Sequence, residues 1–291
     1  MASGWTVTTA LSDSLDDVRS SARIIREMEG VMPQLVSKET LGEGIGLDWK
    51  EISYAALTAS AVTETTDLDN PQQLSDSILT ITPTVVAVET FITDRVAARI
   101  NKKGFAKMGS LAQNAIQRKK DEDGLLVLDG ATTALVGAGN TLTSGHIAAA
   151  VYRITSNATE PGKKPIRCVL HGFQIKDLFD ELVAGVGTYV LQEGPTARVF
   201  SSGFTLPIAG CEVYEDGNIT IDGDSDAKGG VFAQEGILLV QGRAPRILTK
   251  YREERGGGGT SVYHYDEYAY GERSAGNWLF EIYSDAATPT S

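Results

Sequence analysis

The stretch Ser77-Ile-Leu-Thr-Ile-Thr-Pro-Thr-Val-Val-Ala-Val-Glu-Thr-Phe91 leads directly into a long basic segment. Its β-branched residues favour extended structure, so a strand is predicted here. Arg95 to Lys120 contains eight Lys or Arg and no Asp or Glu, in a chain of formal net charge −12. We expect Thr93 or Thr90 to cap a long helix with an apolar side, comprising Val96, Ile100, Met108, Leu111 and Ala115. Asp121 to Gly130 should end that helix, and this order of elements indicates an assembly element rather than an active site.

A projecting hairpin is predicted just upstream of the basic segment. Ile45, Leu47 and Trp49 alternate with polar or glycine residues, as Leu79 and Ile81 do, which is the period of a strand. The stretch 55–73 between them is polar and contains the turn signal Asn70-Pro71. Because an isolated two-stranded hairpin is marginally stable in water, we expect this arm to rest on another subunit.

Composition excludes several classes of protein. The chain has 291 residues, is 42% hydrophobic and 22% charged, and contains no apolar run near the 18 residues of a membrane span. No secretory signal is visible at Met1–Thr6. Cys168 and Cys211 lie in apolar, strand-like contexts, where small buried side chains are expected. These features predict a protein of a reducing cytosol that does not depend on disulfides.

The second half of the chain has α/β character. A helix capped by Thr143 should bury Ile147, Val151 and Ile154, followed by a buried strand over 166–170 and a helix around Leu178. Residues 183–203 resemble a long functional loop. Strands are then expected over 204–214 and 236–240, in a hairpin formed by 246–255 and 260–270, and around Trp278, Phe280 and Ile282.

No catalytic, cofactor or metal motif emerges. Gly42, Gly44 and Gly46 lead into a strand, whereas a nucleotide loop follows a strand and opens a helix. Asp222, Asp224 and Asp226 resemble the start of a calcium loop, but the required later Gly and Glu are replaced by alanines. The three histidines, His146, His171 and His264, are not spaced to form a clustered metal site on a helix. Cys168 and His171 are not expected to form a catalytic pair, because no third residue that would orient them is identifiable. We therefore expect no enzyme activity and no cofactor.

The basic helix has two interpretations. It is either a solvated face or a surface that contacts phosphate or an acidic neighbour. Phe105 is the only aromatic residue within it, so base stacking and sequence-specific reading of nucleic acid are not expected. The candidate contact residues on this helix are Arg95, Arg99, Lys102, Lys103 and Lys107.

At this point the order of elements resembles the major capsid proteins of tailed bacteriophages, with the Hong Kong 97-like fold that encapsulins share. Ala61 to Pro71 and Ile78 to Val85 resemble the outgoing and returning sides of that family's E-loop. Thr93–Lys120 is similar to its spine helix and Asp121–Gly130 to the stop after it. Further similarity lies in the axial-domain segment 167–178, where Gly172 replaces the usual proline, in 204–217, and in 270–287.

The resemblance implies an α+β fold with an N-terminal arm (1–43), an E-loop (44–82), a peripheral domain with the spine helix (83–135), an axial domain (136–225), and peripheral strands with a C-terminal strand (226–291). It implies E-loop contacts between subunits through Trp49, Lys50, Tyr54, Glu64 and Asp67. Residues 183–203 would lie near the axis of each capsomer. The family's lysine–asparagine crosslink does not transfer, because Lys50 has no identifiable partner asparagine.

The implied function is a major capsid protein that self-assembles into hexamers and pentamers of an icosahedral head around double-stranded DNA. Its expected partners are copies of itself, packaged DNA, scaffold, portal and possible cement proteins, with no membrane. A separate scaffold or a removed segment is expected, since only about 40 residues precede the loop. Its location would be the virion, after assembly in the host cytoplasm. The alternatives are an encapsulin-like shell, a tail or decoration protein, and an α/β enzyme.

Overall fold

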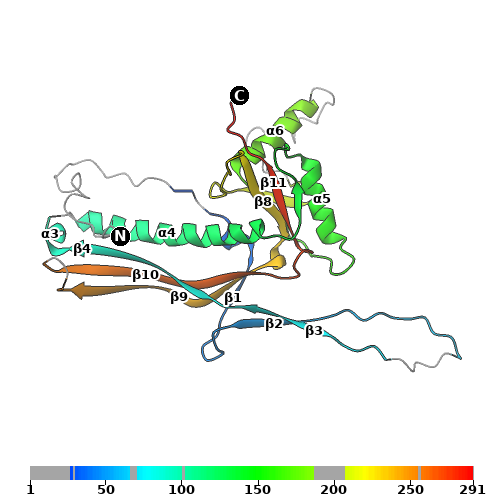
Figure 1. Ribbon diagram of the computed structural model, residues 1–291, viewed down its shortest axis with the longest axis horizontal. Helices are drawn as coiled ribbons and strands as arrows, with labels where there is room; N and C mark the ends of the chain where they lie inside the picture. Colours follow the sequence, from blue (N-terminus) through cyan, green and yellow to red (C-terminus); the bar gives the residue numbers. More distant parts are fainter. Residues whose placement is uncertain are drawn as a thin grey trace.

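The computed structural model describes residues 27–28, 30–65, 71–99, 102–186, 207–254 and 257–290, with only the backbone described for 102–108 and 182–186. Figure 1 shows three parts: a sheet with a long helix along it, a compact α/β region at one end of that helix, and a two-stranded arm that projects away. The mixture of helices with separate sheets agrees with the predicted α+β class.

A four-stranded sheet supports the long helix. Its order is β1 (Ser37–Thr40), β9 (Ile237–Arg252), β10 (Gly259–Glu272) and β4 (Thr84–Thr93). β1 runs parallel to β9, and the other two pairs are antiparallel. The predicted hairpin around the glycines at 256–259 is confirmed, although its first strand begins at Ile237. Gly257 and Gly258 have φ near +90°, which glycine adopts without a steric penalty.

The predicted helix after β4 is present but divided. Thr93 accepts a hydrogen bond from the Val96 amide at 3.4 Å and caps the short helix α3 (Asp94–Ala97). A separate helix, α4, runs from Lys102 to Asp129. The prediction that the helix gives way to a stop at Asp121 is therefore wrong, because the stretch 121–129 forms its last turns. Leu125 and Leu128 are buried there, whereas Leu111 is 41% exposed.

A five-stranded sheet forms the compact region. Its order is β5 (Ala134–Val136), β11 (Leu279–Asp285), β8 (Asp226–Ala233), β6 (Ile166–Leu170) and β7 (Cys211–Glu215). It packs with α5 (Ser144–Thr155) and α6 (Gly172–Val186), and the predicted residues Ile147, Val151 and Ile154 are buried. The range 226–291, predicted to hold peripheral strands and a C-terminal strand, contributes to both sheets, since β8 and β11 pair with strands of the compact region.

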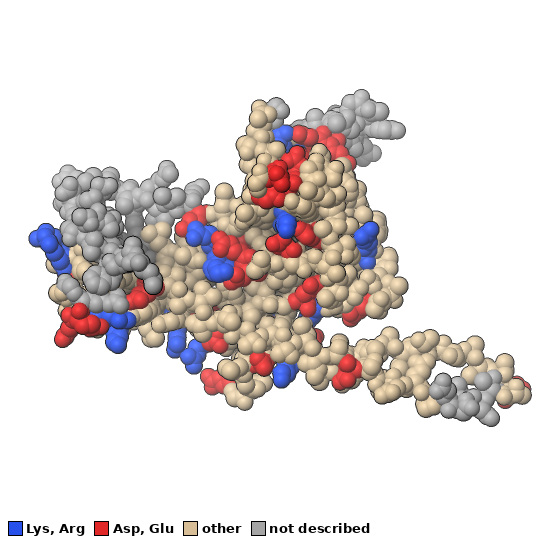
Figure 2. All heavy atoms as spheres, viewed as in Figure 1, with Lys and Arg blue, Asp and Glu red and all other residues tan. Residues whose placement is uncertain are grey.

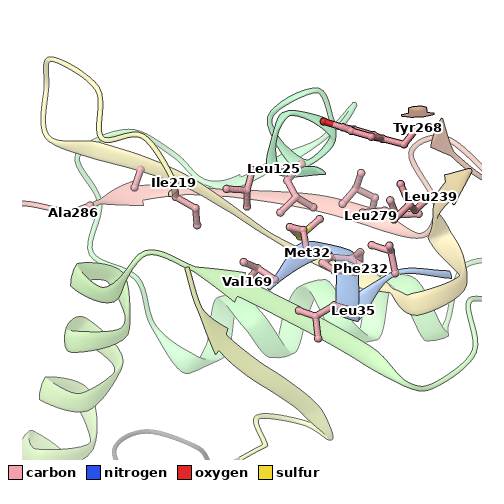
Figure 3. Packing of buried hydrophobic residues seen from close by; sticks show 14 residues of the cluster. Met32, Leu35, Leu125, Val169, Ile219, Phe232, Leu239, Tyr268, Leu279 and Ala286 are labelled. Carbon is pink, nitrogen blue, oxygen red and sulfur yellow. The ribbon is translucent and has the colours of Figure 1, made fainter. Parts of the chain in front are cut away.

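One hydrophobic cluster joins the two regions (Figure 3). Met32 and Leu35 of the short helix α2 (Met32–Leu35) meet Leu125 of α4 there, together with Phe232 and Leu279 of the five-stranded sheet. The 3-10 turn η2 (Gln234–Gly236) connects β8 of one sheet to β9 of the other. The last turns of α4 are thus part of the shared core, which is why they remain helical.

The arm is a separate two-stranded sheet of β2 (Trp49–Tyr54) and β3 (Asp76–Ile81). The strand prediction for Ile45 and Leu47 is wrong: both are exposed in a loop, at 71% and 80%. Gly44 and Gly46 take positive φ there, so the chain turns before the strand starts. Of the predicted loop 183–203, residues 183–186 belong to α6 and the others lie outside the described residues.

Candidate assembly surfaces

The arm exposes large apolar side chains that nothing in the described chain covers. They are Ile52, Tyr54, Leu57, Val62, Leu74 and Ile78, each more than half exposed. Charged side chains are sparse along the visible part of this arm in Figure 2. Contiguous exposed apolar surface usually marks an interaction site. The arm therefore has the surface character of an interface.

The base of the arm is anchored to the body. Trp49 packs against the small cluster formed by Ile81, Leu238 and Val240, and the Arg273 guanidinium lies 5.8 Å from the centre of its ring. Arg273 Nε also donates to Glu51 Oε2 at 2.6 Å. Trp49 is therefore partly used within the subunit, although it was predicted as an intersubunit contact.

The other predicted arm contacts differ in what the structure describes. Lys50, Tyr54 and Glu64 are exposed, and Tyr54 has 70% of its surface free. Asp67 lies outside the described residues. The contact role of these side chains remains a prediction.

The described side chains of the basic run differ between its two ends. Arg95 and Arg99 are exposed near α3, and the side chains of Lys102, Lys103 and Lys107 lie outside the described part. Toward the other end, Arg118 pairs with Glu27 and Glu122, and Lys119 with Asp123. The uniform positive rod expected from the sequence is thus neutralised at its C-terminal end.

Lys120 is the clearest departure from the predicted basic surface. Its Nζ donates to Asp266 Oδ2 at 3.1 Å and to Gln241 Oε1 at 2.7 Å. The ammonium also lies 4.7 Å from the centre of the Tyr268 ring. Asp266 and Gln241 are far from Lys120 in the sequence, so no local pattern could have revealed this buried pair.

The residues considered for chemistry have structural roles. His146 Nδ1 accepts a hydrogen bond from the Thr143 amide at 3.2 Å and so completes the start of α5. Burial lowers the pKa of His171, whose Nδ1 accepts from the Phe173 amide at 3.2 Å. Cys168 and Cys211 are buried free thiols, and burial raises the pKa of Cys168 well above its usual value.

The acidic segment at Asp222 forms a turn that is held by hydrogen bonds from backbone amides to the Asp222 side chain. Asp222 Oδ1 accepts from the amides of Asp224 and Asp226 at 3.0 and 2.9 Å. Across the described ranges, no three His, Cys, Asp or Glu side chains are grouped as metal ligands. Over the same ranges, no helix is long and apolar enough to cross a membrane.

Solved structures provide the comparison. The capsid of cyanophage P-SCSP1u is 11% identical, with a TM-score of 0.71 over 96% of this chain and 95% of that one. Mycobacterium phage Che8 gives 13% identity and a TM-score of 0.70 over 90% and 95% of the two chains. The head structure of Helicobacter pylori bacteriophage KHP40 gives 11% identity and a TM-score of 0.71 over 92% of this chain and 95% of that one. No family model and no curated protein matches the sequence.

The chain has the phage capsid fold. Near-complete coverage in both directions, at these TM-scores, means that the path of the backbone is shared over most of the chain. The Hong Kong 97-like fold predicted from the sequence is thereby confirmed. The predicted correspondence of α4 to a spine helix, and of the β2–β3 arm to an E-loop, stays a prediction. Identities of 11–13% explain why the likeness is visible in structure but not in sequence searches.

Proposed function

We propose that this chain is a major capsid protein, which self-assembles into hexamers and pentamers of an icosahedral phage head around double-stranded DNA. Its fold is shared with capsid and head structures of several phages. A structural role without catalysis is part of the proposal, since His146 serves a helix cap, Asp222 a turn and Lys120 a buried ion pair.

The projecting arm is the observation that carries this proposal. β2 and β3 have six residues each, a length of about 20 Å at ~3.3 Å per residue, with the stretch 55–75 beyond them. Such a hairpin cannot bury its apolar side chains by itself. Lying across a neighbouring copy would cover Tyr54, Leu57 and Leu74 and would leave Lys50, Glu64 and Asp67 as polar contacts at the edge of the interface.

DNA contact is proposed for the N-terminal part of the basic run, residues 95–107. Arg95 and Arg99 would face the packaged phosphates, with Lys102, Lys103 and Lys107 following on α4. Contacts of this kind neutralise phosphate charge without reading sequence. They suit a shell that packages any DNA delivered to it.

The remaining assignments complete the proposal. We retain the N-terminal arm (1–43), the E-loop (44–82) and the axial domain (136–225, now with β8 and β11), with 183–203 near the capsomer axis. Scaffold, portal and cement proteins are proposed partners, the host cytoplasm the site of assembly, and the virion the final location.

An encapsulin-like shell is the second candidate, because encapsulins share the fold and enclose protein cargo. The contents of purified particles separate the two: nucleic acid raises the ratio of absorbance at 260 nm to that at 280 nm, whereas a cargo enzyme co-purifies as a distinct polypeptide.

Electron microscopy of the expressed chain tests the proposal. Expressed alone and with a candidate scaffold, the chain should form closed, uniform particles in negative stain. A chain that stays monomeric under both conditions would contradict the proposal, and rings or trimers without shells would favour a tail or decoration protein.

A further inference from the structure

Two acidic side chains meet where three distant segments of the chain join. Asp121 belongs to α4, and Asp216 follows β7 of the five-stranded sheet. Both are fully buried, with relative exposures of 0%. Asn218 bridges the two carboxyl groups, since its side-chain Nδ2 donates to Asp121 and its backbone amide donates to Asp216. The third segment, residues 30–32, packs so closely that a Cβ on Gly30 would lie 2.0 Å from the Asp121 carboxyl carbon.

Every oxygen of this carboxyl pair accepts a hydrogen bond from the surrounding segments. The Met32 amide donates to Asp121 Oδ1 and Asn218 Nδ2 to Asp121 Oδ2, both at 2.9 Å. The Val31 amide donates to Asp216 Oδ2 at 3.2 Å and the Asn218 amide to Asp216 Oδ1 at 2.9 Å. The pair thus connects the N-terminal segment, α4 and the turn after β7 through four bonds.

Within the described residues, no Lys or Arg forms an ion pair with either carboxylate. On α4, Lys120 is directed to Asp266, and Arg118 to Glu27 and Glu122. From β10, the Tyr270 hydroxyl is buried and has no hydrogen-bond partner among the described residues; its burial, and after it the Asp121 charge, raise its pKa. The surroundings supply neutral donors and further negative charge, so two ionised carboxylates side by side would be costly.

One proton shared between the two groups resolves this cost. Burial raises the pKa of Asp216 to about 7; the Asn218 amide opposes the shift, and the neighbouring Asp121 carboxyl adds to it. The proton that Asp216 keeps up to about pH 7 is therefore the one that relieves the repulsion between the two carboxyl groups.

We propose that the Asp121–Asp216 pair is a proton-dependent lock that fastens residues 31–32, α4 and the turn at 216–218 to one another. With the shared proton present, the pair carries one negative charge and all its bonds are satisfied. Loss of that proton places two like charges in a buried site and loosens the junction. The inference concerns the subunit itself and does not depend on shell formation.

The sign of the pH dependence follows from the raised pKa. The folded chain keeps a proton that the unfolded chain releases above about pH 3.8, the ordinary value for an aspartic acid. The contribution of the lock to stability is therefore complete below that pH. It falls as the pH rises toward 7, and it is lost above the folded pKa.

Asp216→Asn tests the lock, because it removes the second charge at every pH; it also loses one of the two backbone hydrogen bonds that Asp216 accepts, a cost that does not depend on pH. Asp224→Asn is the matched control, since Asp224 is exposed in the turn before β8 and loses the same charge. Between pH 5.5 and 8, the unfolding equilibrium constant of the natural chain should rise at least about tenfold relative to that of Asp216→Asn. Asp224→Asn should follow the natural chain.

Hydrogen exchange provides a second measurement that needs no variant. The protection factors of the Val31, Met32 and Asn218 amides should fall above pH 7 in the natural chain, while those of β8 stay constant. In Asp216→Asn they should not depend on pH. Equal pH dependence of unfolding in the natural chain and Asp216→Asn, or constant protection of these three amides, would overturn the proposal.

Discussion

Lys120 of α4 donates to Asp266 of the central strand β10 at 3.1 Å, and both side chains are buried. Gln241 of β9 donates to the other Asp266 oxygen at 2.5 Å, so the carboxylate is held by the helix and by the neighbouring strand. The pair fixes how the long helix lies on its sheet. A cation within a basic run is here part of the interior.

Lys120→Met should destabilise the subunit by about 3–5 kcal/mol, because it leaves the Asp266 carboxylate buried without its cation. The measurement is the free energy of unfolding in urea. Lys119→Met is the matched control: it removes the neighbouring, exposed lysine and its pair with Asp123, and should cost less than ~1 kcal/mol. Equal losses in the two variants would show that the buried pair does not stabilise the packing of helix on sheet.

Alanine substitutions at two glycines of α4 should change the stability of the subunit in opposite directions. A Cβ on Gly109 meets nothing within 4 Å, so Gly109→Ala should stabilise the helix by up to ~1 kcal/mol. On Gly124 it would lie 2.9 Å from Met32 Cβ and 3.2 Å from Tyr270 Cζ, so Gly124→Ala should cost about 1–3 kcal/mol through overpacking. Thermal unfolding of both variants checks this, and a stabilised Gly124→Ala would contradict the close packing.

Deleting residues 55–73 should leave a folded subunit that fails to form stable shells. The deletion leaves Leu74 and Ser75 as a two-residue connection between Tyr54 and Asp76, a length that suits a hairpin. The body should unfold at the temperature of the natural chain, since none of the described residues of the tip belongs to the core clusters. Shells of normal size and heat resistance would mean that the arm does not hold neighbouring subunits together.

Arg95→Glu combined with Arg99→Glu should weaken DNA binding without unfolding the protein. For every phosphate that the variant no longer neutralises, the slope of log binding constant against log salt concentration should become shallower by about 0.9. Fluorescence anisotropy with a labelled duplex over a range of salt gives this slope. Lys38→Glu combined with Lys50→Glu, which changes two other exposed cations by the same charge, is the control. An identical slope in both double variants would remove the proposed phosphate interaction.

The fold was largely predictable because its elements carry local signals. Ile147, Val151 and Ile154 mark a buried helical face, and the glycines at 256–259 mark a hairpin. The errors occurred where tertiary contacts override local pattern. Asp121 to Asp129 has the composition of a helix end, yet Leu125 and Leu128 reach the shared core and keep it helical.

The buried polar contacts of the structure could not be predicted from local sequence patterns. Lys120 and Asp266 are 146 positions apart in the chain, and Asp121 and Asn218 are 97 apart. No spacing rule connects such residues, so a basic run was interpreted as surface although its last member is interior. The arm was easier to predict, because a polar stretch between two alternating segments is a local pattern.

The arm strand β3 continues into β4 with only Thr82 and Pro83 between them. β4 in turn is paired with β10 at ten successive positions. Because antiparallel hydrogen bonds lie perpendicular to the strands, a pull along the arm strains these ten positions in shear, all at once, rather than opening them one by one. If internal pressure stretches a shell, the tension on a subunit's arm would thus load the β4–β10 pairing of the same subunit in shear, the direction in which that pairing resists force best.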